Sequence, residues 1–452
     1  MLIIRIIGMA SNIYISSRAG ATSMGIYHMI FSVFTFGITF AASGTGFAVT
    51  RLASEGKYSD GNIIRKCLGI SMAMSAAGFC FFFFGAPFVG KSMIKNPDTI
   101  PAVRMLSFAL PCMGASSVYR GYFIAKRRAG VMTASSIAEE TVCIAVTVAL
   151  LNLGIISKSY MCLVYGCLVS NFVAFAFDTI ACRICIKRDF SGIKPVRFKD
   201  IFAICVPIAL GSYLRTGLVA AENLMIPIQF RKYGIENAVG EYGIIKAMAM
   251  PILMFPTVFI QAFSSMLVPE ISEMNAQSRP NGIRHVTTLA INTATMFAFF
   301  IAMMLFKHHD IISSSFFEES GVSLYLGMLS LLAIPMYLDT VADSILKGLN
   351  LQNASLVYNI IDSVLRLASI VLIMPRIGPV FYIVMLYISE IFNLSLSLGK
   401  VSKTTGLKVD FVSLIIIPAL SACAAMLFSA PLVQAIVYAA VYLGVSRILR
   451  KS

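Results

Sequence analysis

The chain has 452 residues, 58% of them hydrophobic and 13% charged, against roughly 45–50% apolar and about 25% charged in an ordinary soluble protein. One soluble core of this length cannot bury so much apolar side chain, so the composition excludes a soluble enzyme, a disordered chain and a single-pass receptor. The net charge of +15 indicates Lys- and Arg-rich cytoplasmic loops of a membrane protein, rather than a nucleic-acid surface.

Continuous apolar runs predict fourteen helices, which makes the fold class all-α and polytopic. Closed β-barrels are excluded, because the runs are not alternating. In chain order the expected helices cover residues 1–17, 25–50, 63–90, 102–125, 132–154, 160–186, 200–229, 238–267, 285–307, 322–347, 353–375, 378–399, 409–429 and 431–448.

The loops between these helices differ in charge. One alternate set holds 23 of the 36 Lys and Arg residues, and the other set holds nine. Cytoplasmic loops collect Lys and Arg, so we expect the first set, and with it both termini, on the cytoplasmic side of the plasma membrane.

An internal repeat divides the sequence. Ala109-Leu110-Pro111 recurs as Ala333-Ile334-Pro335, and Glu139 in the fifth helix corresponds to Asp362 in the eleventh. The spacing predicts two six-helix lobes, residues 1–190 and 191–403, followed by an extra helix pair over residues 404–452. Two lobes in the same orientation suit alternating access.

Charged residues inside the expected helices are the candidate site, because intramembrane charges are costly and by default functional. The cations expected in a substrate cavity are Arg5, Arg215, Lys246 and Arg366, and the acids are Glu139, Glu222 and Asp362. Asp362 and Arg366 are four residues apart and could neutralise each other. A purely structural role in holding helices together stays open for all of these residues.

Two motifs suggest cofactors and are discounted. Residues 85–92 read GAPFVGKS, which matches the phosphate-binding GxxxxGK[ST] pattern, but the pattern requires a strand before it and a helix after it. Cys182 and Cys185 form one C-x-x-C pair, whereas a structural zinc site needs four ligands. We therefore expect no nucleotide, metal or other cofactor.

Six short stretches follow one another in a recognisable order: residues 5–8 (RIIG), 25–27 (GIY), 51–55 (RLASE), 120–123 (RGYF), 206–212 (VPIALGS) and 267–273 (LVPEISE). They resemble the multidrug/oligosaccharidyl-lipid/polysaccharide flippase superfamily, and most closely its stage V sporulation protein B and polysaccharide-export group. The resemblance implies two lobes that flip undecaprenyl-pyrophosphate-linked saccharides outward. Arg5 fits a cavity arginine of the MurJ-type lipid II flippases, whereas residues 36–40 (FGITF) lack the arginine of that group's second span.

Three functions fit these features of the sequence. The first is a flippase or exporter of a lipid-linked polysaccharide or peptidoglycan precursor, acting as a monomer without nucleic acid. The second is an ion-coupled small-molecule exporter of the multidrug (MATE) type. The third is a non-transporting membrane scaffold or enzyme.

Overall fold

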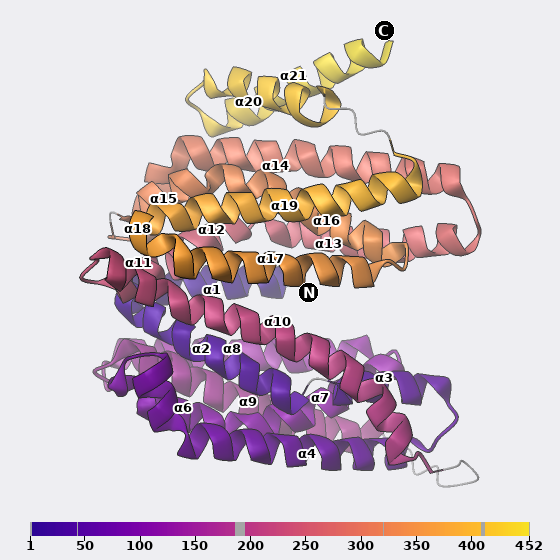
Figure 1. Ribbon diagram of the computed structural model, residues 1–452. Coiled ribbons are helices and arrows are strands. Elements are labelled where there is room, and N and C mark those ends of the chain that lie inside the picture. The colour runs from indigo at the N-terminus through magenta and orange to yellow at the C-terminus, as the bar shows by residue number, and fades with distance from the viewer. Residues whose placement is uncertain (1, 43, 186–194, 320, 408–411, 452) are drawn as a thin grey trace. The chain divides into compact units, whose positions relative to one another are not determined.

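The computed structural model describes residues 2–42, 44–185, 195–319, 321–407 and 412–451 (Figure 1). Every regular element in these residues is a helix. Each of the fourteen predicted ranges overlaps one helix or a series of short ones, so the all-α prediction is confirmed. Nine helices in this part of the chain are long and apolar enough to cross a membrane, and a pair bent by 55° would be a tenth. The protein is a multi-pass membrane protein, and the number of its spans is approximate.

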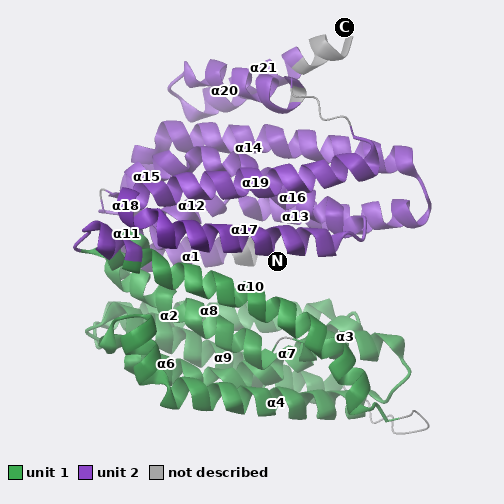
Figure 2. Cartoon of the chain, viewed as in Figure 1, with its two compact units in different colours: residues 1, 18–228, 237–243 green, residues 2–17, 229–236, 244–452 purple. Residues whose placement is uncertain are grey.

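The chain forms two compact units (Figure 2). Unit 1 contains Arg18–Ile228 and Asn237–Gly243. Its main helices are α2 (Ala21–Ala42), α3 (Thr45–Glu55), α4 (Asp60–Phe84), α6 (Ile100–Ser107), α7 (Ala109–Ala125), α8 (Ala129–Leu153), α9 (Ser159–Cys185), most of α10 (Phe198–Tyr233) and α11 (Ala238–Gly243). The short helix α5 (Ala86–Phe88) and single turns at Val89–Met93 and Pro97–Thr99 follow α4.

Unit 2 contains Leu2–Ser17, Gln229–Glu236 and Ile244–Ser452. Its helices are α1 (Leu2–Ala19), α12 (Met250–Met254), α13 (Thr257–Ala276), α14 (Pro280–Phe316), α15 (Gly321–Leu329), α16 (Ala333–Gly348), α17 (Gln352–Leu372), α18 (Met374–Ile377), α19 (Pro379–Thr405), α20 (Ile417–Met426) and α21 (Pro431–Lys451). Single turns at Ile244–Ala249, Ser330–Leu332 and Val412–Ile416 complete it. The contacts thus group most of α1 with unit 2 and most of α10 with unit 1, and the sequence repeat stays a prediction.

Residues 85–92 continue α4 as α5 and a π-helical turn at Val89–Met93. A nucleotide-binding loop instead joins a strand to a helix. The pattern at Lys91 and Ser92 therefore lies in a wholly helical context.

Close glycine contacts bring the helices of unit 1 together. A Cβ at Gly121 in α7 would lie 2.4 Å from the carbonyl oxygen of Gly46 in α3. Gly44, with φ of 88°, lies at the break between α2 and α3, and a Cβ there would lie 2.8 Å from the Cys205 carbonyl oxygen. Gly44 lies where α2 ends and α3 begins, and the close approach of Gly121 to Gly46 brings α7 against α3, next to the cavity described below.

The C-terminal helix pair packs on α14. Lys307 of α14 donates hydrogen bonds to the carbonyl oxygens of Met426 and Phe428, the second at 2.5 Å. The Tyr438 hydroxyl donates to the Met296 carbonyl oxygen at 2.8 Å. A cation at the C-terminal end of α20 satisfies carbonyl groups that the helix itself leaves unpaired.

Candidate functional site

Unit 1 contains an open cavity of about 560 Å³ between α2, α3, α7, α8, α9 and α10. Hydroxyl and amide groups, two arginines, one glutamate and several apolar side chains line it. The lining residues are Ile38, Thr39, Ala42, Gly46, Phe47, Thr50, Met113, Ser116, Ser117, Arg120, Gly121, Ile124, Glu139, Asn171, Ala174, Ser212, Arg215 and Thr216.

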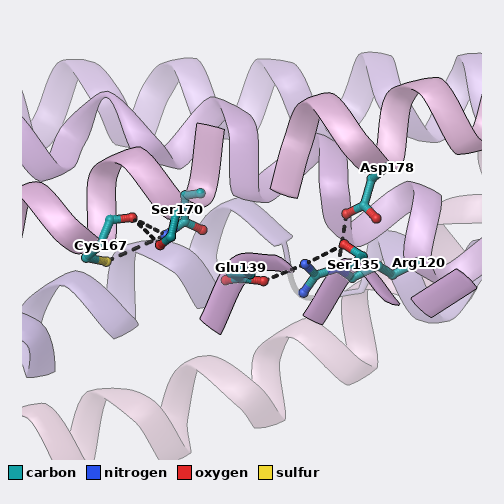
Figure 3. A network of polar contacts seen from close by, with 7 residues as sticks. Arg120, Ser135, Glu139, Cys167, Ser170 and Asp178 are labelled. Carbon is teal, nitrogen blue, oxygen red and sulfur yellow. Dashed lines mark hydrogen bonds and ion pairs between the residues drawn. The ribbon is translucent and has the colours of Figure 1, made fainter. Parts of the chain in front are cut away.

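Arg120 is the centre of a polar network in this cavity (Figure 3). Its Nε atom lies 3.1 Å from Oδ2 of Asp178, and its Nη2 atom lies 2.6 Å from Oε2 of Glu139. Nη2 also donates to Oγ of Ser135 at 3.3 Å. Three helices, α7, α8 and α9, therefore meet at one guanidinium group.

The two carboxylates of this network differ in burial. The Asp178 side chain is 0% exposed, whereas the Glu139 and Arg120 side chains are 26% and 29% exposed. Burying a carboxylate is costly unless a cation and hydrogen bonds compensate it. Asp178 therefore holds Arg120 on the side away from the cavity, and Glu139 contacts it on the side that lines the cavity.

Arg215 is the second cation of the cavity wall. It lies on α10 with Ser212, three residues before it, and with the adjacent Thr216, and all three line the cavity. Among the described residues it forms no ion pair or hydrogen bond. Its guanidinium is available to an anion in the cavity.

Hydroxyl groups add neutral donors. Oγ of Ser116 is buried without a hydrogen-bond partner among the described atoms, and Ser116 lines the cavity. Arginine forks and hydroxyl donors together bind phosphate oxygens well, because charge-assisted hydrogen bonds are the stronger ones. The cavity has the donor set for a phosphate-bearing ligand and an apolar wall beside it.

A second charged group lies in unit 2. Nη2 of Arg366 is 3.6 Å from Oδ2 of Asp362, and Oγ of Ser389 donates to Oδ1 of Asp362 at 2.7 Å. Both charged side chains are largely buried. The four-residue spacing on α17 thus produces the ion pair that the sequence suggested.

The remaining predicted residues have separate surroundings. Lys246, in the π-helical turn Ile244–Ala249, lies 5.6 Å from the ring centre of Tyr382 in unit 2. Glu222 is 4% exposed on α10 and has contacts within the structure. The side chain of Arg5 lies outside the described residues.

The structure therefore brings together Arg215 and Glu139 in one cavity, and it pairs Asp362 with Arg366 elsewhere. Sequence reasoning missed Arg120, which it counted among the cytoplasmic loop cations at the end of a helix. Arg120 instead lies inside α7, five residues before the helix ends. One signal was present: Asp178 is an intramembrane acid with no cation three or four residues away on its own helix, so its partner had to come from another one.

Comparison with known proteins agrees with this architecture. Residues 1–275 match the family model described as polysaccharide biosynthesis protein. Stage V sporulation protein B of Bacillus subtilis is 22% identical over 392 residues, which are 83% of this chain and 76% of that protein.

Two solved structures share the fold. The lipid II flippase MurJ in its inward closed conformation gives a TM-score of 0.74 at 14% identity, over 99% of this chain and 97% of its own. An inward-facing multidrug resistance MATE family transporter of the MOP superfamily gives 0.70 at 15% identity, over 90% and 96%. At such identities the likeness establishes the fold alone.

Proposed function

The chain belongs to the polysaccharide biosynthesis protein family, within the multidrug/oligosaccharidyl-lipid/polysaccharide flippase superfamily, and from this premise we propose that it flips an undecaprenyl-pyrophosphate-linked saccharide outward across the plasma membrane. The family match and the shared fold support a flippase or MATE-like transporter of that superfamily. The identity of the substrate, the outward direction of transport and the location in the plasma membrane are our proposal. We also propose that the chain transports its substrate without catalysing a reaction.

The observation that carries the proposal is the unit-1 cavity with Arg215 in its wall. A pyrophosphate headgroup is anionic and loses water inside the membrane, so it needs cationic donors there. Arg215 on α10 supplies such a donor, and Ser212 and Thr216, whose hydroxyls donate to the carbonyl oxygens of Ile208 and Ser212, line the wall beside it. The apolar residues Ile38, Phe47 and Met113 in the same wall suit the lipid part of the substrate next to its headgroup.

The relatives support the same substrate class. One solved structure with this fold is named a lipid II flippase, and the family model is described by polysaccharide biosynthesis. The first description names a lipid as the substrate, and the second names polysaccharides. From the loop charges we infer that both termini lie on the cytoplasmic side. We also propose that a single chain carries out transport.

The experiment that tests the proposal uses the full chain in proteoliposomes with a fluorescent undecaprenyl-pyrophosphate-linked disaccharide. Arg215→Ala should reduce flipping at least about tenfold, because one charged hydrogen bond contributes about 1.5–3 kcal/mol. Arg215→Lys should keep part of the activity, because it retains the charge but loses the planar fork.

The matched control is Lys199→Ala, which removes a cation from the first turn of the same helix, outside the cavity wall. It should flip the lipid at the wild-type rate. Equal rates for Arg215→Ala and wild type would contradict a role of this cavity in headgroup transport.

One observation favours the alternative of a MATE-type exporter. Glu139 places a carboxylate in a cavity wall that also holds Phe47 and Met113, and an acid together with an aromatic ring suits an organic cation. In the same vesicles, uptake of ethidium driven by a proton or sodium gradient, without movement of the lipid-linked disaccharide, would establish this alternative instead.

A further inference from the structure

The guanidinium of Arg120 has one fixed partner and one exchangeable partner. Asp178 holds Nε from the buried side, where its own side chain has no exposure. Glu139 holds Nη2 and is partly exposed, and both Glu139 and Arg120 line the cavity. A ligand in the cavity reaches the Glu139 side of the fork and not the Asp178 side.

The charges of this network do not balance. One positive charge on Arg120 faces two carboxylates, so the group carries a net charge of −1 when all three are ionised. Asp178 alone neutralises Arg120, which makes Glu139 the surplus anion. A phosphate oxygen could take the position of the Glu139 carboxylate, because arginine binds either group with the same fork geometry.

From this geometry we propose that Arg120 is a second phosphate ligand, and that Glu139 competes with the phosphate of the substrate for it. The inference rests on the proposed function and extends it to a residue outside the predicted site. Glu139 then lowers the affinity for the headgroup, and so favours its release after transport. Asp178 is a positioning residue, because it orients the fork without reaching the ligand.

A neighbouring hydroxyl supports a ligand at this position. Ser116 is 6% exposed, and its buried Oγ has no hydrogen-bond partner among the described atoms. Ser116 lies on α7, four residues before Arg120, and the two side chains therefore share a helix face. A phosphate bound to Nη2 of Arg120 has this unused donor on the same face.

The alternative is a structural clamp, in which Glu139 only ties α8 to α7. The change Glu139→Gln separates the two interpretations. Glutamine keeps a hydrogen-bond acceptor for Nη2 and removes the negative charge. A clamp predicts unchanged or weaker ligand binding, whereas competition predicts tighter binding.

The test is isothermal titration of the purified full chain in detergent with inorganic pyrophosphate. Glu139→Gln should bind pyrophosphate about tenfold more tightly than wild type, because it removes a like charge within a few ångströms of the ligand. Glu140→Gln is the matched control. It makes the same change at the next residue, which does not line the cavity, and should stay within about twofold of wild type.

Arg120→Lys keeps a cation for Asp178, so it protects the fold, but it removes the second arm of the fork. It should weaken binding about tenfold, and adding it to Glu139→Gln should abolish the gain in affinity. Different results would refute the competition by Glu139 and the flippase proposal. If Arg215→Ala loses pyrophosphate but Glu139→Gln binds like wild type, the competition is refuted and the flippase proposal stands. If the wild-type chain binds no pyrophosphate, both are refuted.

Discussion

Asp178 is the most deeply buried acid of the unit-1 network, and its only ion-pair partner in the described part of the chain is Arg120. Asp178→Ala removes a charged hydrogen bond to Arg120, which contributes about 1.5–3 kcal/mol, while Glu139 still compensates the charge of the guanidinium. We expect Asp178→Ala to lower the stability of the folded chain by an amount in this range, measured from the thermal unfolding midpoint in detergent.

The control for this prediction is Asp98→Ala. Asp98 forms an ion pair with Lys158 at 2.8 Å, but its side chain is 65% exposed. Its carboxylate raises the pKa of Lys158 through a hydrogen bond, and solvent screens such a pair. The midpoint should stay unchanged, and an equal loss for Asp98→Ala and Asp178→Ala would contradict the importance of burial.

Single residues were the hardest part to predict from the sequence. The spacing of Asp362 and Arg366 gave their ion pair, because both lie on one helix. Arg120, Glu139 and Asp178 lie on three helices, and sequence spacing carries no information on which helices are neighbours. Charge and an expected mid-helix position identified Arg215 and Glu139 as candidates, but only the packing brought them to one cavity.

Helix packing near the cavity depends on Gly121 of α7. An added methyl group would lie 2.4 Å from the backbone oxygen of Gly46, so α3 and α7 would have to separate. Overpacking of this kind costs about 1–3 kcal/mol. Gly121→Ala should lower the unfolding midpoint in the detergent-solubilised protein.

Gly130 of α8 provides the opposite case. It has open space around its Cβ position, and alanine is favoured over glycine within helices by up to about 1 kcal/mol. Gly130→Ala should leave the midpoint unchanged or raise it slightly. A lower midpoint for both variants would show that the glycines act through something other than the contact with Gly46.

At the scale of elements, continuous apolar runs predicted where the helices lie but not where they break. The predicted range 25–50 is interrupted at Gly44, and the range 238–267 bends between Met254 and Thr257. A run of apolar residues looks the same whether it is one straight helix or two short ones. The first break carries Gly44, whose φ of 88° is left-handed, and the second carries Pro256, which cannot donate a helical hydrogen bond.

At the scale of the whole molecule, the loop charges predict the topology. Cysteines introduced at Lys95 and Glu318, both exposed, should react with an impermeant maleimide in intact cells. Cysteines at Arg127 and Lys403 should react only after permeabilisation, because the positive-inside bias places those loops in the cytoplasm. Labelling of all four positions in intact cells would contradict the proposed orientation.

The membrane class and the superfamily could both be predicted from the sequence, the first from the composition of the whole chain and the second from ordered motifs between residues 5 and 273. The substrate could not, because it depends on a few side chains whose neighbours only the folded chain defines. The two six-helix lobes remain a prediction. In unit 1 the repeat acid Glu139 pairs with an arginine of another helix, whereas in unit 2 its counterpart Asp362 pairs within its own helix.

The most direct test of the account measures flipping of a fluorescent undecaprenyl-pyrophosphate-linked disaccharide by the purified wild-type chain in proteoliposomes, with Arg215→Ala measured beside it. We predict that the wild-type chain moves the lipid across the bilayer faster than protein-free vesicles do, and that Arg215→Ala loses most of this activity. Wild-type vesicles that flip the lipid no faster than protein-free ones would contradict the account.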